Sequence, residues 1–176
     1  ESIIPKSTSP IRKVYLNPVG CKPTTEALLA IKEADAIVIG PGSLYTSIIP
    51  NFLVEKITDE ILRSRAVKVY ICNVMTQHGE TDGYTALDHV EALLRHSHHA
   101  LIDYCIVNTA KIPQHLLEKY KGEEAYPVEP DIKKIRELGV AVVEGDIMTA
   151  DDYVRHNAEK ISKIIVNVIY KTKGSG

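Results

Sequence analysis

A glycine-rich turn that follows a short apolar stretch has the clearest potential for chemistry in this sequence. Residues 36–39 (AIVI) predict a buried strand, and Gly40–Gly42 (GPG) ends it. Hydroxyl residues then follow, where free backbone amides open a helix. Because such amides bind anions at the edge of open α/β sheets, we predict a phosphate-binding turn, although an ordinary βα turn explains the same pattern. The predicted contacts are Gly40, Gly42, Ser43, Leu44 and Thr46.

Neutral polar residues follow the next predicted strand, which covers residues 67–74. Asn73, Thr76 and Gln77 carry hydrogen-bond donors and acceptors without charge. They suit the edge of a uracil base, a ribose or a sugar hydroxyl. The alternative is that these side chains brace their own loop through local hydrogen bonds.

Arg155 is the candidate cation, and we place it in the first turn of the last helix, which we expect to begin near Asp151 or Asp152. A guanidinium can hold a pyrophosphate with two parallel hydrogen bonds. The alternative is a solvated arginine or one paired with either aspartate.

The acidic and histidine groups fit no metal-ligand pattern. Glu80, Asp82 and Asp88 are assigned to a solvated loop and helix face. The cluster His96, His98 and His99 lies at a predicted helix C-terminus and lacks a second ligand pair, so a structural or solvated role is favoured. No nucleophile and base can be paired by spacing, so catalytic residues stay unassigned and no metal is predicted.

Strands that alternate with helices predict an α/β fold with a mainly parallel sheet covered on both faces. We expect one domain over residues 1–170 and a disordered tail over residues 171–176. Thr24 or Thr25 is expected to cap the first helix, and Gly139 to end another in the left-handed conformation. The predicted strands cover residues 12–16, 36–40, 67–74, 101–107 and 140–143.

Composition narrows the class of protein. The 176 residues are 44% hydrophobic and carry a net charge of −2, so a real core is expected and nucleic acid is not an expected partner. No apolar run approaches the roughly 20 residues of a membrane span, and no signal peptide is recognised, which favours the cytoplasm. The cysteines number three, which is odd, and they form no C-x-x-C motif. We therefore predict that Cys21, Cys72 and Cys105 are reduced structural thiols.

Two long segments resemble a known family. Gly40–Asn51 (GPGSLYTSIIPN) and Asn73–Tyr84 (NVMTQHGETDGY) are similar to the signature segments of gluconeogenesis-factor proteins of the YvcK type, in the CofD-like superfamily. Arg155–Asn157 (RHN) resembles the family's C-terminal Arg-His motif. The resemblance covers about residues 10 to 170, and it implies a Rossmann-like three-layer α/β sandwich. It also implies that the family's amino-terminal half, with its Gly-Gly-Gly-Thr-Gly loop, is absent here, in agreement with a chain that begins at Glu1 rather than Met.

The resemblance implies one function and leaves a second open. The first is a regulatory protein that binds a nucleotide sugar such as UDP-N-acetylglucosamine and is linked to gluconeogenic growth, cell shape and cell-wall synthesis. Its partners would then be metabolic or cell-wall synthesis proteins, and a homodimer is a further hypothesis. The alternative is a CofD-like transferase that moves a phosphorylated small acid onto a deazaflavin-type acceptor. Whether the chain is an enzyme stays open, no cofactor is predicted beyond the nucleotide ligand, and the mainly neutral loops favour a binding protein.

Overall fold

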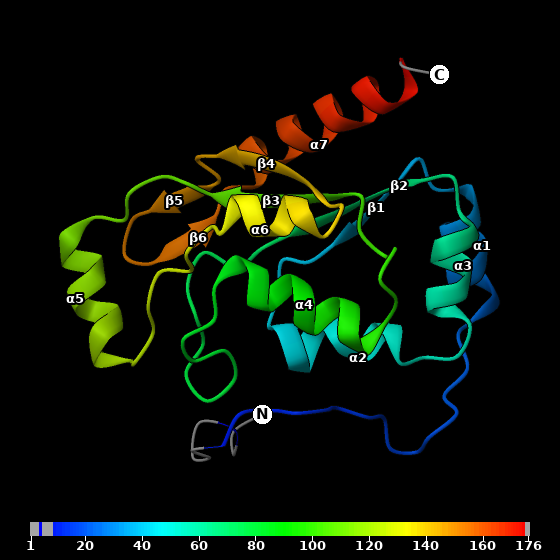
Figure 1. Ribbon diagram of the computed structural model, residues 1–176, viewed down its shortest axis with the longest axis horizontal. Helices are drawn as coiled ribbons and strands as arrows, with labels where there is room; N and C mark the ends of the chain where they lie inside the picture. Colours follow the sequence, from blue (N-terminus) through cyan, green and yellow to red (C-terminus); the bar gives the residue numbers. More distant parts are fainter. Residues whose placement is uncertain (1–3, 5–8, 175–176) are drawn as a thin grey trace.

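A four-stranded parallel sheet lies at the centre of the protein in the computed structural model, which describes residue 4 and residues 9–174 (Figure 1). The strands are ordered β1-β2-β3-β4, and a separate antiparallel pair, β5 and β6, follows them in the chain. This arrangement confirms the predicted α/β class. The strands are β1 (Ala36–Ile39), β2 (Val67–Ile71), β3 (Tyr104–Asn108), β4 (Ala141–Gly145), β5 (Met148–Ala150) and β6 (Val154–His156).

Helices connect the parallel strands, as parallel pairing requires. Thr24 caps the first helix of the chain, which precedes β1, through its hydroxyl, and Gly139 has a φ of +83°, so both predictions are confirmed. The helices are α1 (Thr25–Glu33), the π-helix η2 (Leu44–Ile48), α2 (Ile49–Phe52), α3 (Ile57–Arg63), α4 (Ala86–His96), α5 (Gln114–Gly122), α6 (Ile132–Glu137) and α7 (Ala158–Lys173).

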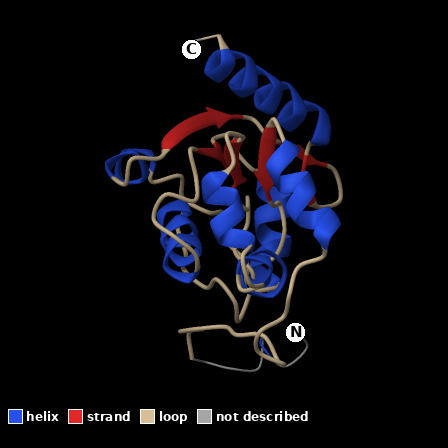
Figure 2. Ribbon diagram, turned by 90° about the vertical axis from the view of Figure 1, so that its right-hand side faces the viewer, coloured by secondary structure: helices blue, strands red, loops and turns tan. Residues whose placement is uncertain are grey.

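The sheet has a helical layer on each face. Helix α7 lies along one face, whereas α4 and α6 lie on the other (Figures 1 and 2). The core is divided in the same way, with one buried cluster beneath α4 and α6 and a second between the sheet and α7. Since the strands run in one direction, their carboxyl ends meet at one edge, where the loops after β1, β2 and β3 lie together.

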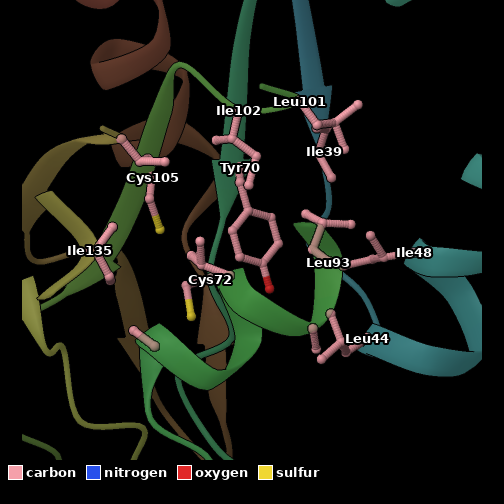
Figure 3. Packing of buried hydrophobic residues seen from close by; sticks show 14 of the residues in the cluster. Ile39, Leu44, Ile48, Tyr70, Cys72, Leu93, Leu101, Ile102, Cys105 and Ile135 are labelled. Carbon is pink, nitrogen blue, oxygen red and sulfur yellow. The ribbon is translucent and has the colours of Figure 1, made fainter. Parts of the chain in front are cut away.

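The first cluster is built around Tyr70, a fully buried residue of β2 (Figure 3). Its strand neighbours are Ile39 on β1 and Cys105 on β3. The thiols of Cys72 and Cys105 are buried too, and this burial raises the pKa of Cys105 to about 12 and that of Cys72 well above its usual range. Both thiols are therefore protonated and pack as small apolar groups, as the sequence predicted.

Two predictions about the ends of the chain are wrong. Residues 12–16 form no strand, because the extended segment has no ladder partner and instead packs Ile11 and Val14 against the core. The predicted tail begins too early, because α7 continues to Lys173; Ser175 and Gly176 lie outside the described residues. Over residue 4 and residues 9–174, no helix has the length and apolar character needed to cross a membrane.

Candidate functional site

The glycine-rich turn after β1 depends on Gly40. This residue has a φ of +85°, and a Cβ added to it would lie 3.2 Å from the carbonyl oxygen of Ile71. Gly42 is different, since an added Cβ would make ordinary contacts with Ser47 and Ile48. Gly40 therefore shapes the turn, while Gly42 brings its backbone to the carboxyl edge of the sheet.

The buried carboxylate of Glu80 accepts hydrogen bonds from amides at the start of η2, where the sequence pattern predicts that an anionic ligand binds. The backbone N–H groups of Tyr45 and Thr46, at the start of η2, donate to Oε1 of Glu80 over 3.0 and 2.9 Å. Glu80 is only 3% exposed, so its assignment to a solvated loop is wrong. The sequence pattern could not reveal this, because the carboxylate arrives from a loop 34 residues further along the chain. These two amides are therefore not available to an anionic ligand.

The two loops that carry most of the predicted contacts hold each other in place. The Ser43 hydroxyl donates to Oε1 of Gln77 over 2.8 Å, and the hydroxyls of Tyr45 and Tyr84 lie 2.7 Å apart. Thr76 is buried, its hydroxyl accepts from the Tyr126 amide, and its own amide donates to the Tyr126 carbonyl. For Thr76 and Gln77, the loop-bracing alternative therefore describes the contacts that the side chains make.

The remaining acidic groups also have local partners. Asp82 accepts a hydrogen bond from the Gly79 amide and lies 3.2 Å from His78. Asp88 forms a capping box with Thr85 at the start of α4. Within the part of the chain that the structure describes, no three His, Cys, Asp or Glu residues are grouped as a metal would require. Both aspartates therefore accept hydrogen bonds from nearby backbone amides and hold the loop after β2 and the start of α4 in place.

The β5–β6 hairpin was not expected from the sequence, and it changes the placement of Arg155. The last helix begins at Ala158, with Asn157 as its N-cap, and not near Asp151 or Asp152. Arg155 lies in the middle of β6, opposite Thr149, so its placement in a first helical turn is wrong. Its side chain is exposed, and among the described residues its guanidinium has no ion pair or hydrogen bond.

A cavity of about 200 Å³ opens where the hairpin meets the carboxyl edge of the sheet. The turn after β1 and the loop after β2 form one wall, and the hairpin and α5 form the other. A neighbouring cavity of about 460 Å³ shares Val74 with it and extends along the loop after β3. The smaller cavity is lined by Gly42, Asn73, Val74, Met75, Tyr120, Val154 and His156.

His156 is the group in this cavity that sequence reasoning missed. Its Nε2 donates to the carbonyl oxygen of Cys72 over 3.1 Å, which ties the hairpin to the end of β2. Burial lowers the pKa of His156, so the ring is neutral near pH 7. The period of two along a strand could have indicated it, because Val154 and His156 then share a face that excludes Arg155.

Comparison with known proteins places the chain in a family. The sequence profile of 2-phospho-L-lactate transferase CofD matches residues 1–148. The chain belongs to the CofD family. It is 46% identical over 170 residues to the gluconeogenesis factor of Bacillus subtilis (strain 168), covering 96% of this chain and 54% of that protein. For the gluconeogenesis factor of Halalkalibacterium halodurans, identity is 47% over 176 residues, with 99% of this chain and 55% of that protein covered.

A solved structure supports the same assignment. The crystal structure of protein BH3568 from Bacillus halodurans matches this CofD-family chain with a TM-score of 0.91 and 48% identity, over 94% of this chain and 53% of that protein. The chain thus spans about half the length of the relatives that it matches. The resemblance to gluconeogenesis factors that the motifs indicated is confirmed.

The nine predicted contacts of this CofD-family chain separate into groups. Gly42 and Asn73 line the smaller cavity, and Arg155 is exposed on the strand that also carries His156. Leu44 is fully buried in the core, so its side chain faces no ligand. The others shape or brace the site, and they are Gly40, Ser43, Thr46, Thr76 and Gln77.

Replacing Gly40 with alanine is expected to lower the free energy of unfolding by about 1–3 kcal/mol, because a positive φ and a close backbone oxygen both oppose a Cβ. Gly42→Ala is the matched control, and we expect it to change stability by less than about 1 kcal/mol. Urea denaturation of both variants measures the difference. Equal stability of the two variants would contradict the geometry of the turn.

Stability is expected to fall as the pH drops below about 6.5, the ordinary pKa of histidine. Burial lowers the pKa values of His89 and His156, so the unfolded chain binds more protons than the folded one in this range. Stability is then complete above about pH 6.5, and each histidine removes at most about 1.4 kcal/mol per pH unit below it. Denaturation between pH 7.5 and 5 should show a shallower dependence of stability on pH for His89→Gln than for the wild type, and an equal dependence would contradict the role assigned to His89.

Proposed function

We propose that this chain is part of a nucleotide-sugar-binding regulatory protein of the gluconeogenesis-factor type, with UDP-N-acetylglucosamine as the representative ligand. The observation that carries the proposal is the cavity at the carboxyl edge of the sheet, which joins the loops after β1 and β2 to the hairpin. Its polar side chains are neutral, and an exposed arginine lies on the same hairpin. This combination suits a ligand with a hydroxylated ring attached to a diphosphate.

Arg155 is the residue that we assign to the diphosphate. Its side chain is on the opposite side of β6 from His156, and no partner within the described residues holds its guanidinium. The amides of Tyr45 and Thr46 are already bonded to Glu80, so a guanidinium is the stronger anion-binding group left near the cavity. Ligand binding would then alter the surface of the hairpin that partner proteins meet.

The biological setting follows from the relatives' names. Two of them are called gluconeogenesis factors, and we extend that link to this chain. Cytoplasmic location and a role in cell shape and cell-wall synthesis belong to the same proposal, as do homodimers and partner proteins from metabolism or wall synthesis. Because the chain spans about half of each relative, the complete natural polypeptide is the molecule to test.

The second candidate function is transfer of a phosphorylated small acid to a deazaflavin-type acceptor, which the name of the matching family profile favours. Asp82 and Asp88 both serve as local caps in this chain, which favours binding over metal-assisted transfer. Turnover of a deazaflavin acceptor by the complete polypeptide would establish the transferase.

Calorimetric titration with UDP-N-acetylglucosamine tests the binding proposal. We expect saturable binding by the complete polypeptide, weakened by about 1–3 kcal/mol in Arg155→Ala through loss of a charge-assisted contact. Arg63→Ala is the matched control, because Arg63 ends α3 before the amino-terminal end of β2, away from the cavity. Absence of binding by the wild type would refute the proposal, and an equal loss in both variants would remove Arg155 from the site.

A further inference from the structure

The tautomer of His156 follows from its hydrogen bond. A carbonyl oxygen only accepts, so the Nε2 that lies 3.1 Å from the Cys72 oxygen must carry the ring proton. The neutral ring therefore holds a lone pair on Nδ1. Within the described residues, Nδ1 makes no hydrogen bond and is not among the fully enclosed polar atoms, so it is accessible from the cavity that His156 lines.

Several contacts hold this imidazole in position. His156 pairs with Met148 across the hairpin, and the amide of Asn157 donates to the carbonyl of Ile147 over 2.8 Å. On the other side, the Val154 amide donates to the Tyr120 hydroxyl over 3.0 Å. The hydrogen-bonded backbone on both sides of His156 thus holds its imidazole ring in place, so Nδ1 is oriented before a ligand binds.

The rest of the cavity lining disfavours a phosphate. No lining residue carries a charge, and the Nδ1 of His156 presents a lone pair to the cavity. Lone pairs repel phosphate oxygens but accept from hydroxyl groups. A volume of about 200 Å³ accommodates one sugar ring and not an entire nucleotide sugar.

We propose that His156 recognises a sugar ring, with Nδ1 accepting a hydrogen bond from one of its hydroxyl groups, so that this cavity is the sugar subsite and the diphosphate lies outside it toward Arg155. The inference rests on the proposed function and names the part of the ligand that this cavity takes. Ribose and hexose present the same hydroxyl chemistry, and the choice of probes distinguishes them.

The test uses His156→Gln in the complete natural polypeptide. The glutamine amide can still donate to the Cys72 carbonyl in place of Nε2, but it offers no acceptor at the position of Nδ1. We expect unchanged thermal stability and about tenfold weaker binding of UDP-N-acetylglucosamine, the loss of about one hydrogen bond. His99→Gln, on the exposed surface, is the control and should bind as the wild type does.

Smaller probes identify the hydroxyl group that His156 contacts. If His156→Gln binds UDP tenfold more weakly than the wild type does but binds 2′,3′-dideoxy-UDP equally well, the contact is a ribose hydroxyl. If His156→Gln binds UDP as well as the wild type does, the contact is a hexose hydroxyl. Both results support the proposal. A tenfold loss that persists with inorganic pyrophosphate would overturn it, because the contact would then be to phosphate. Equal affinity of variant and wild type for every probe would also overturn it while leaving the proposed function intact.

A spectroscopic measurement covers the case in which the variant does not fold. The ¹⁵N resonance of His156 Nδ1 in the wild type should report an unprotonated nitrogen, and it should move upfield when UDP-N-acetylglucosamine saturates the protein. An unchanged resonance at saturation would overturn the inference. If the wild type binds none of the uridine nucleotides, the proposed function fails and this inference fails with it.

Discussion

Replacement of Glu80 with alanine is expected to lower the free energy of unfolding by about 3 kcal/mol and to disorder the turn after β1. The carboxylate accepts from the amides of Tyr45 and Thr46 in a buried setting. Its loss leaves the buried amide of Tyr45 and the partly buried amide of Thr46 without this acceptor, and each hydrogen bond to a charged group is worth about 1.5–3 kcal/mol. Urea denaturation measures the stability, and titration with UDP-N-acetylglucosamine measures the effect on binding.

Glu80→Gln is the matched control for this prediction. It keeps a carbonyl oxygen where the carboxylate Oε1 lies and removes the charge, so we expect it to retain most of the stability that Glu80→Ala loses. Asp88→Asn provides a second comparison, because Asp88 caps α4 at the surface of the same loop region. A stable Glu80→Ala protein with wild-type binding would show that the amides find another acceptor, and the role assigned to Glu80 would be wrong.

Replacement of Tyr70 with alanine is expected to cost about 3–5 kcal/mol, the range for deleting a buried aromatic ring. Tyr70 is fully buried at the centre of the cluster that Figure 3 shows, between its strand neighbours Ile39 and Cys105. The cavity left behind cannot collapse easily, because paired strands fix the backbone on both sides. Thermal and urea unfolding of the variant measure the loss.

Tyr70→Phe separates the ring from its hydroxyl. The hydroxyl oxygen is enclosed, its only polar neighbour within the described residues is the weakly polar thiol of Cys72, and burial raises the pKa of Tyr70 well above the usual value. Removing it should therefore leave stability unchanged or increase it by about 1 kcal/mol. If Tyr70→Phe destabilises as strongly as Tyr70→Ala, the hydroxyl has a partner that this account lacks.

Local signals in the sequence determined much of the architecture. The apolar stretch 36–39 and the β-branched stretch after residue 67 form the expected strands, because a buried parallel strand needs a short run of apolar residues. Gly139 and Thr24 act locally, since the hydroxyl of Thr24 needs an amide only three residues away. Such caps could be predicted because neighbouring atoms supply their free energy.

Tertiary structure decided the candidate site. Residues 148–156 carry both an acidic helix-start signal and a strand period. They form a hairpin, which the hydroxyl of Tyr120, 34 residues earlier in the chain, holds through the backbone of Val154. The amides of η2 meet Glu80 rather than solvent for a similar reason. In each case the hydrogen bond joins segments that are distant in sequence. A local sequence pattern therefore gives no information about whether that bond forms. The sequence by itself therefore determined the α/β class and the four parallel strands, whereas only the folded chain decided that residues 148–156 form a hairpin, with His156 at the cavity and Arg155 outside it.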